Sequence, residues 1–488
     1  MTSRNNSFAY SAYTAISLFL LLLFSSSEAQ IIKVSYTSNV VSTFSGKVYL
    51  YMSKENKKPK EGPAGMDFSP CNSIVVNKIK PGETVVFNDS VKSYPVSITD
   101  IERGQYYVQA VWDRDLGGRA IGNSPGNMYN QSLKITLTKN NLEVFNINCK
   151  ESIDDPSFKE TRSTKEMKVP SRLLSFFYQR QVTFNTAIKL PKEYYNDSLK
   201  RFPVLYYVHG YGGDYHHESG REEFSNPIDT TPCIIVVLDG NCPLGHSVYT
   251  NSENNGPWGD ALTREFIPQF EERYRCNGVR LLTGHSSGGW TVLSLMFHYP
   301  KVFTACWSSS PDPVDFTNFQ TVNLYKDKNL FYAHDSSLKM VATVAGIIPW
   351  QSQKNAYQWE NVIDRGEQMH SFDAVFSQRN PDGTPRKLVN EKTGVIDPVT
   401  VEHWKKYDLS LFLKNNWTTL KSLLDGKVRI SVGNEDNFLL NFAVHQLEDE
   451  VKKINGKIAF AYYPGDHFTV ATPEYLTAGM KFLEQSLK

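Results

Sequence analysis

The sequence lacks the features that most directly signal a nucleic-acid or metal-binding protein. Its 52 Lys and Arg are nearly balanced by 51 Asp and Glu, and no run of five or more basic residues occurs. The six cysteines form no Cys-x-x-Cys pair. These absences disfavour a polyanionic partner, a zinc knuckle and a thioredoxin-type site. We therefore expect no nucleic-acid partner, no metal and no cofactor.

No long apolar segment occurs beyond the N-terminus. The apolar run at 16–24 is less than half of the roughly 20 residues that a membrane span needs, and it is followed by small residues at Ser27 and Ala29. This pattern predicts a signal peptide over 1–29, with an uncleaved membrane anchor as the alternative. We expect a secreted protein, extracellular or in the endomembrane lumen, with no stable membrane insertion.

Secretion would place the cysteines in an oxidising compartment, where disulfides persist. Cys71 and Cys149 both lie in the N-terminal region and are the natural pair, with two buried free thiols as the alternative. Asn-x-Ser/Thr sequons beyond the signal segment are candidate glycosylation sites if they lie on exposed loops. These are Asn88, Asn130, Asn196 and Asn416.

The length of 488 residues favours two domains. Over 30–149, short β-rich runs alternate with turn signals and no helical pattern intervenes, which predicts a small all-β sandwich. Residues 150–172 are polar and charged and are expected to be a linker. Over 173–488, apolar runs alternate with amphipathic segments, interrupted by an irregular stretch at about 311–427. This pattern predicts an α/β domain with a doubly wound, mostly parallel sheet and a large insertion.

The strands of the α/β domain are predicted from continuous apolar runs, and its helices from apolar residues at three- and four-residue spacing. The expected strands are 204–208, 233–238, 279–283, 302–307, 428–432 and 458–463. The expected helices are 258–275, 290–298, 438–453 and 473–487.

Residues 284–288 read Gly-His-Ser-Ser-Gly and fit the Gly-x-Ser-x-Gly pattern between a predicted strand and a predicted helix. Flanking glycines allow a sharp bend, and this bend makes the serine hydroxyl project beyond the end of the sheet. Ser286 is therefore the candidate nucleophile. Ser287 suits the ordinary role of capping the following helix better.

A serine hydroxyl needs a base, and in this arrangement the base follows the last strand. His467 comes directly after the strand at 458–463 and a Pro-Gly turn. The acid that orients the histidine should follow the preceding strand, where both Glu435 and Asp436 occur; Asp436 is preferred because its shorter side chain can turn back toward the site. The order Ser, Asp, His is that of α/β hydrolases.

Residues 209–213 read His-Gly-Tyr-Gly-Gly after a predicted strand and suit an oxyanion loop, with a plain glycine turn as the alternative. The expected donors are the backbone N–H groups of Tyr211 and Ser287. The polar stretch at 239–258 either lines the pocket or caps the following helix. His216 and His217 are adjacent in sequence, so a solvated loop is favoured there over a metal site.

These motifs make residues 173–310 and 428–488 similar to the esterase family of esterase D, S-formylglutathione hydrolase, the mycobacterial antigen 85 proteins, enterochelin esterase and feruloyl esterases. The segments that carry the resemblance are 190–195, 202–210, 255–259, the 284–288 elbow and 465–467. The whole chain resembles two-domain esterases with an N-terminal β domain.

The resemblance implies a serine carboxylic-ester hydrolase with Ser286, Asp436 and His467 as its triad. It leaves the substrate open, because the 311–427 stretch exceeds the short cap of the family. We expect a small-molecule, carbohydrate or lipid ester. Two alternatives remain: an acyltransferase using the same triad, as in the antigen 85 proteins, and a secreted binding protein that has lost catalysis.

Overall fold

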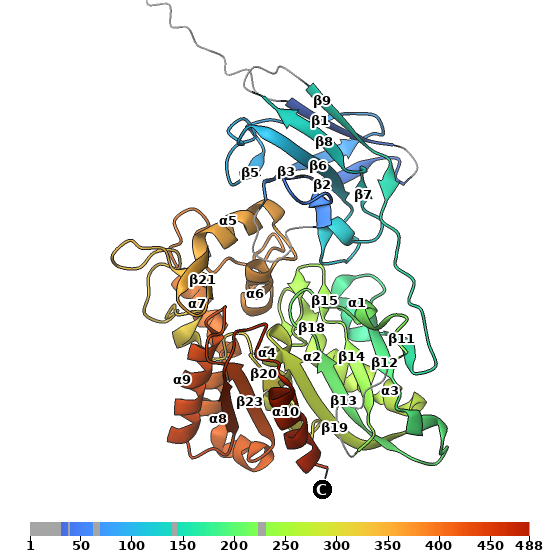
Figure 1. Cartoon of the computed structure of the whole chain (residues 1–488), viewed down its shortest axis with the longest axis vertical. Coiled ribbons are helices and arrows are strands. Elements are labelled where there is room, and N and C mark those ends of the chain that lie inside the picture. The colour runs from blue at the N-terminus through green and yellow to red at the C-terminus, as the bar shows by residue number, and fades with distance from the viewer. Residues whose placement is uncertain (1–30, 38–39, 62–68, 139–143, 223–230, 488) are drawn as a thin grey trace, which may run out of the picture.

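A computed structural model describes residues 31–37, 40–61, 69–138, 144–222 and 231–487 (Figure 1). The segment expected to be a signal peptide lies outside these residues. Within them, no helix is long and apolar enough to cross a membrane.

The N-terminal part consists of two sheets, drawn in blue and teal at one end of the molecule in Figure 1. The smaller has the order β4-β1-β9, and the larger the order β10-β7-β6-β2-β3-β5 with β8 beside β6. Their strands are β1 (Ile31–Tyr36), β2 (Phe44–Ser53), β3 (Cys71–Ile79), β4 (Val85–Phe87), β5 (Lys92–Tyr94), β6 (Gly104–Asp113), β7 (Met128–Tyr129), β8 (Leu133–Leu137), β9 (Val144–Cys149) and β10 (Glu151–Ser152). Short 3-10 turns occur at Pro59–Glu61 and Ile121–Asn123.

One apolar core lies between these two sheets and draws on both. Tyr36 from the smaller sheet packs against Trp112 of the larger, with ring centroids 4.7 Å apart, and Phe44 meets the edge of the same indole. The alternation of buried and partly buried residues along β1 is what allows one face of the strand to enter this core.

The expected disulfide between Cys71 and Cys149 is absent, since both are buried free thiols. Cys149 belongs to the core between the two sheets, whereas Cys71 belongs to a separate apolar cluster that faces the insertion. The two side chains therefore lie in different apolar clusters. The sequence placed both cysteines in one domain, but this did not mean that they lie on the same face of a sheet.

Of the four sequons, Asn130 does not meet the expected condition of exposure. It is only 6 % exposed, and its Oδ1 accepts a hydrogen bond from the Ala110 N–H at 2.6 Å. Asn416 lies within helix α8 (Leu409–Leu424) rather than in a loop. Asn196 is exposed, and Asn88 is partly exposed in a turn.

The segment 150–172 is not a linker throughout. Thr164–Pro170 forms β11, an antiparallel edge strand paired with β12 (Thr183–Lys189). Met167 and Val169 of this strand are buried while Lys168 between them is exposed. Charged residues on the outer face hid the alternating pattern in the sequence.

The second part is built on an eight-stranded sheet in the order β11-β12-β14-β13-β19-β20-β23-β24. The pairs β11/β12 and β12/β14 are antiparallel and the others are parallel, as expected for an α/β hydrolase. Beyond β11 and β12, the strands are β13 (Phe202–Val208), β14 (Ile234–Leu238), β19 (Cys276–His285), β20 (Ala305–Ser309), β23 (Val428–Gly433) and β24 (Ala459–Tyr463). Short two-residue strands β15 (Asn241–Cys242), β16 (Gly245–His246), β17 (Asn251–Ser252) and β18 (Gly256–Pro257) form two small hairpins.

Helices cover both faces of this sheet. Helix α10 (Pro473–Gln485) packs on one face against Trp307 and Leu205. The opposite face is covered by α4 (Ser287–His298), α9 (Leu440–Lys453) and the stretch formed by α2 (Trp258–Ala261), a π-helical turn (Leu262–Phe266) and α3 (Ile267–Arg273). A short helix, α1 (Arg172–Tyr178), precedes β12.

The insertion is smaller than expected, because α8 lies beside α4 and α9 and so belongs to the helical layer. The remainder contains a hairpin of β21 (Met340–Val344) and β22 (Ile348–Ser352), followed by α5 (Gln353–Ile363), α6 (Gln368–Phe376) and α7 (Pro398–Trp404). Helix α5 packs Trp359, Val362 and Ile363 against the larger sheet of the β domain. The insertion thus joins the two parts of the chain.

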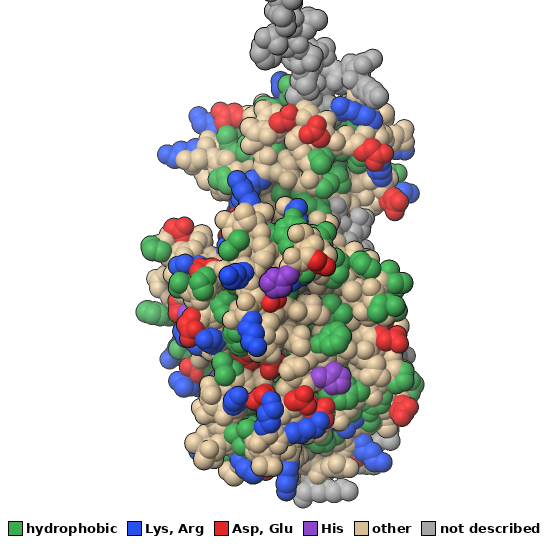
Figure 2. All heavy atoms as spheres, turned by 90° about the vertical axis from the view of Figure 1, so that its left-hand side faces the viewer, with side chains coloured by type: hydrophobic (Ala, Val, Ile, Leu, Met, Phe, Trp, Pro, Cys, Tyr) green, Lys and Arg blue, Asp and Glu red, His purple; other side chains and the backbone are tan. Residues whose placement is uncertain are grey.

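Figure 2 shows charges of both signs interspersed over this side of the molecule.

Candidate active site

Ser286 lies on a sharp turn between β19 and α4. Its backbone angles, φ 59° and ψ −124°, are ones that residues with a side chain rarely adopt. The turn is fixed from both sides, since the Ser286 N–H donates to the Ser309 carbonyl at 3.0 Å and its own carbonyl accepts from the Asp312 N–H at 3.2 Å. The strained serine is therefore held in place by the neighbouring strand.

The flanking glycines are required by close backbone contact. A Cβ atom on Gly288 would lie 2.1 Å from the Val208 carbonyl oxygen, and one on Gly284 would lie 2.5 Å from the Gly288 carbonyl oxygen. No side chain fits at either position without moving the backbone of β13. This explains why the pattern needs glycine on both sides of the serine.

The glycine loop at 209–213 lies against the serine. A Cβ on Gly210 would be 3.2 Å from Ser286 Cβ and 3.9 Å from Ser286 Oγ. Within the described part of the chain, the N–H groups of Tyr211 and Ser287 donate no hydrogen bond. Both expected donors therefore remain available to a ligand oxygen.

His467 and Asp436 form a buried pair. His467 Nδ1 lies 2.7 Å from Asp436 Oδ2, and the two residues are 3 % and 0 % exposed. The other oxygen of Asp436 accepts from the Phe438 N–H at 2.9 Å. Glu435 is exposed, so Asp436 is the one of the two candidate acids that contacts the histidine. The Nδ1 contact leaves Nε2 as the ring nitrogen available for proton transfer.

The histidine ring lies beside the elbow. Its centroid is 4.5 Å from that of His285, the residue before the serine. No hydrogen bond joins Ser286 Oγ to His467 among the residues described, and in unliganded enzymes this bond is often long until substrate binds. The backbone N–H of His467 donates to Asn437 Oδ1 at 3.1 Å, which fixes the loop that carries the ring.

Burial, reinforced by the neighbouring His467, lowers the pKa of His285 to about 4. His285 is therefore neutral near pH 7 and does not repel a positive charge on His467. Its Nδ1 lies 2.8 Å from Ser309 Oγ. The residue supports the elbow without competing for the proton.

The structure adds Asp312 and Gln368, which the sequence did not single out. The Ser287 hydroxyl donates to Asp312 Oδ2 at 2.5 Å, so it does not cap α4 as expected. Gln368 Nε2, from α6 of the insertion, lies 3.3 Å from Ser287 Oγ and 3.3 Å from Asp312 Oδ2. Burial raises the pKa of Asp312 to about 6. Asp312 follows β20 directly, a position that could have flagged it, whereas nothing in the sequence pointed to Gln368.

The polar stretch at 239–258 contacts the glycine loop. Asn241 donates from Nδ2 to the Gly213 carbonyl at 3.2 Å, and Asn254 donates to the Ser377 carbonyl of the insertion at 2.8 Å. The start of α2 has no side-chain cap from Pro257. This stretch thus connects the glycine loop to the insertion. In the described ranges, no group of three His, Cys, Asp or Glu side chains could hold a metal ion.

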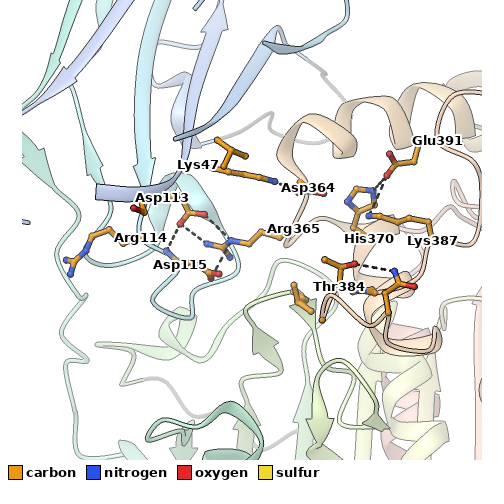
Figure 3. Close-up of a pocket in the computed structure, with 17 residues that line it drawn as sticks. Lys47, Asp113, Arg114, Asp115, Asp364, Arg365, His370, Thr384, Lys387 and Glu391 are labelled. Carbon is orange, nitrogen blue, oxygen red and sulfur yellow. Dashed lines mark hydrogen bonds and ion pairs between the residues drawn. The ribbon is translucent and has the colours of Figure 1, made fainter. Parts of the chain in front are cut away.

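A cavity of about 680 Å³ lies away from these residues, between the β domain and the insertion (Figure 3). Ion pairs line it: Lys47 with Asp364, Arg365 with Asp113, and Lys387 with Glu391. Neither Ser286 nor His467 borders it. We interpret it as part of the seam between the two regions.

Comparison with protein families gives one match: a family described as Putative esterase matches residues 179–471, which include the elbow, the glycine loop and the His467–Asp436 pair. None of the curated proteins matches.

Several solved structures resemble the chain at low identity. A ferulic acid esterase is 16 % identical, with 68 % of this chain and 100 % of that chain covered and a TM-score of 0.36. The fluorophosphonate-binding serine hydrolase FphF of Staphylococcus aureus is 13 % identical (66 % and 98 % covered, TM-score 0.41). An S-formylglutathione hydrolase from Agrobacterium tumefaciens is 12 % identical (68 % and 99 % covered, TM-score 0.39). At these values we transfer no residue role from them.

Proposed function

Because the chain belongs to the Putative esterase family and is a carboxylic-ester hydrolase, we propose that it acts as a serine hydrolase. In this proposal Ser286 is the nucleophile, His467 is the general base and Asp436 is the residue that orients the histidine. The observation that carries this proposal is the buried 2.7 Å contact between His467 Nδ1 and Asp436 beside the strained elbow serine.

In the first half of the reaction, Ser286 Oγ attacks the ester carbonyl while His467 Nε2 takes the hydroxyl proton. Asp436 accepts from Nδ1–H and stabilises the imidazolium that forms. The proton then passes to the leaving alcohol, and an acyl-serine remains. In the second half, water attacks this acyl group with the same proton path, and the acid product leaves.

The negative charge that develops on the carbonyl oxygen needs donors that are already in place. The N–H groups of Tyr211 and Ser287 suit this role, since the glycine loop lies against Ser286 and neither group is engaged elsewhere in the described chain. Loss of one such donor costs about 100- to 1,000-fold in turnover.

Hydrolysis of p-nitrophenyl acetate tests the proposal. We expect the wild-type protein to turn over this ester and Ser286→Ala to lose at least about 1,000-fold in kcat. Ser42→Ala, which removes an exposed serine of the β domain that belongs to no Asn-x-Ser/Thr sequon, is the matched control and should keep wild-type activity. Absence of esterase activity in the wild-type protein, or full activity in Ser286→Ala, would refute it.

The products distinguish hydrolysis from acyl transfer. We expect free acid as the acyl product both without and with added sugar or lipid alcohols, because water completes the reaction. Predominant formation of a new ester with an added alcohol would identify an acyltransferase instead. A panel of aryl, acetylated-sugar and lipid esters then defines the substrate class.

We also propose that the protein is secreted, which is supported by the apolar run at 16–24 and the small residues that follow it. Expression of the full chain in a eukaryotic secretion host should yield protein in the medium that begins at residue 30. Protein retained in the membrane with its N-terminus intact would contradict cleavage. On secretion, Asn196 is the best-exposed glycan acceptor of the four.

A further inference from the structure

The loop between β6 and β7 leaves the β domain and reaches the glycine loop beside Ser286. Arg119 of this loop makes the contact: its Nη1 donates to the Tyr211 hydroxyl at 2.9 Å and to the Gly366 carbonyl at 3.3 Å. The guanidinium also lies over the Tyr211 ring, 4.6 Å from its centroid. One residue of the β domain thus holds the side chain whose own backbone N–H is an expected oxyanion donor.

Tyr211 is held from the insertion as well. Its hydroxyl lies 2.5 Å from the Gly366 carbonyl and 3.1 Å from Glu367 Oε2. A Cβ on Gly366 would lie 2.4 Å from the Arg119 carbonyl, so the loop and the insertion are in close backbone contact here. Burial, with a contribution from Glu367, raises the pKa of Tyr211, which keeps the hydroxyl protonated near neutral pH.

Arg119 also reaches the other end of the glycine loop. Its Nε donates to Asn241 Oδ1 at 3.2 Å, and Asn241 in turn donates to the Gly213 carbonyl at 3.2 Å. Gly212, between the two contacted residues, has a φ of +86° and carries no side chain that could hold it in place. A hydrogen bond from the Gly213 N–H to the Gly210 carbonyl at 3.1 Å closes the turn from within, and the contacts made by Arg119 and Asn241 hold it from outside.

The segment that presents Arg119 is anchored by the seam in Figure 3. Arg365 of the insertion makes two hydrogen bonds to Asp113, at 3.0 and 2.8 Å, and also donates to the Gly118 carbonyl at 2.7 Å. The Arg365 and Asp113 side chains are 10 % and 4 % exposed. A bidentate pair with this burial fixes position as well as charge. The base of the Arg119 loop is therefore rigid.

We propose that Arg119 is a positioning residue for catalysis: by holding Tyr211 it keeps the Tyr211 N–H aimed at the oxyanion, so that the β domain forms part of the esterase site. The inference rests on the proposed function of Ser286 and the oxyanion loop. Arg119 acts through Tyr211 and need not touch the substrate. A displacement of about 1 Å in a positioned group costs about 100-fold in rate.

Steady-state kinetics on p-nitrophenyl acetate test this. Arg119→Ala should lower kcat about 10- to 100-fold and change KM by less than about threefold, because the lost interaction is one made in the transition state. Tyr211→Phe keeps the ring but removes the hydroxyl that Arg119 binds. It should lower kcat in the same way and leave KM nearly unchanged. The double variant should be no more than about threefold slower than the slower single variant, since both substitutions remove the hydrogen bond between Arg119 and the Tyr211 hydroxyl.

Arg180→Ala is the matched control. Arg180 donates to the Leu116 carbonyl of the same loop at 2.8 Å but does not contact Tyr211. Its loss therefore weakens the contact between the two domains without releasing the oxyanion loop. We expect wild-type kcat. An equal loss in Arg180→Ala, an effect confined to KM, or wild-type kcat in both Arg119→Ala and Tyr211→Phe would overturn the inference.

A boronic acid that forms a tetrahedral adduct with serine gives a second measurement. Its affinity should fall in Arg119→Ala by about the same factor as kcat, because the adduct places an oxygen in the oxyanion hole. Unchanged affinity would overturn the positioning role. If the wild-type protein is inactive, the proposed function fails; if it is active and Ser286→Ala is not, only the inference is at stake.

Discussion

Replacement of Ser286 by glycine should make the protein more stable while it abolishes catalysis. The residue has φ 59° and ψ −124°, a conformation that costs about 1 to 3 kcal/mol for a residue with a Cβ atom. Glycine adopts such angles without that cost, but its freer unfolded chain offsets about 0.5 to 1 kcal/mol. The expected net gain in the free energy of unfolding is about 0 to 2.5 kcal/mol and centres on about 1 kcal/mol.

Ser286→Ala is the control for the hydroxyl. Alanine keeps the Cβ and therefore the strain, so its stability should stay within about 0.5 kcal/mol of the wild type. Urea unfolding followed by tryptophan fluorescence measures both variants. The midpoint for Ser286→Gly should be higher than those for Ser286→Ala and the wild type, with an unchanged slope. Equal midpoints for the glycine and alanine variants would refute the idea that the elbow stores strain.

Three further predictions concern the residues around the elbow. Asp436→Asn should lower kcat about 10,000-fold, while Glu435→Gln, at the exposed neighbour, should keep wild-type kcat on p-nitrophenyl acetate; the reverse ranking would reassign the acid. Gly288→Ala should cost at least about 3 kcal/mol in urea unfolding because its Cβ meets the Val208 carbonyl, whereas Gly278→Ala, whose Cβ meets open space at φ +87°, should cost about 1 kcal/mol. The folded-state pKa of Asp312 is raised to about 6 from an ordinary 3.8, so its stabilising contribution is present below about pH 4 and lost as the pH rises through 6. Asp312→Asn should therefore gain stability relative to the wild type by about 2 kcal/mol more at pH 8 than at pH 4, and an equal difference at both pH values would contradict the shift.

The α/β sheet could be predicted from the sequence because its strands are continuous apolar runs. The six strands expected over 204–463 all occur, with shifts of a few residues at their ends. Each candidate site residue follows one of these strands, so the topology alone brings them to one edge. The apolar pattern of each strand and the position of each site residue after a strand were therefore sufficient, and no contact between distant segments had to be known.

The rest of the site depends on contacts that local patterns do not encode. Gln368 and Glu367 come from an insertion without regular periodicity, and Arg119 comes from a different domain. The same reason explains the wrong disulfide: Cys71 packs on a face of the β domain that the insertion covers. Strand β11 was missed for a different reason, because it is an edge strand whose outer face is charged.

Labelling with a fluorophosphonate, followed by mapping of the modified peptide, tests the central claim most directly. Only a serine activated by a neighbouring base reacts with this reagent at an appreciable rate. We predict one modified residue, Ser286, and loss of labelling in His467→Ala. Labelling of a different serine, or an active wild-type esterase that is not labelled at Ser286, would contradict the assignment of the nucleophile.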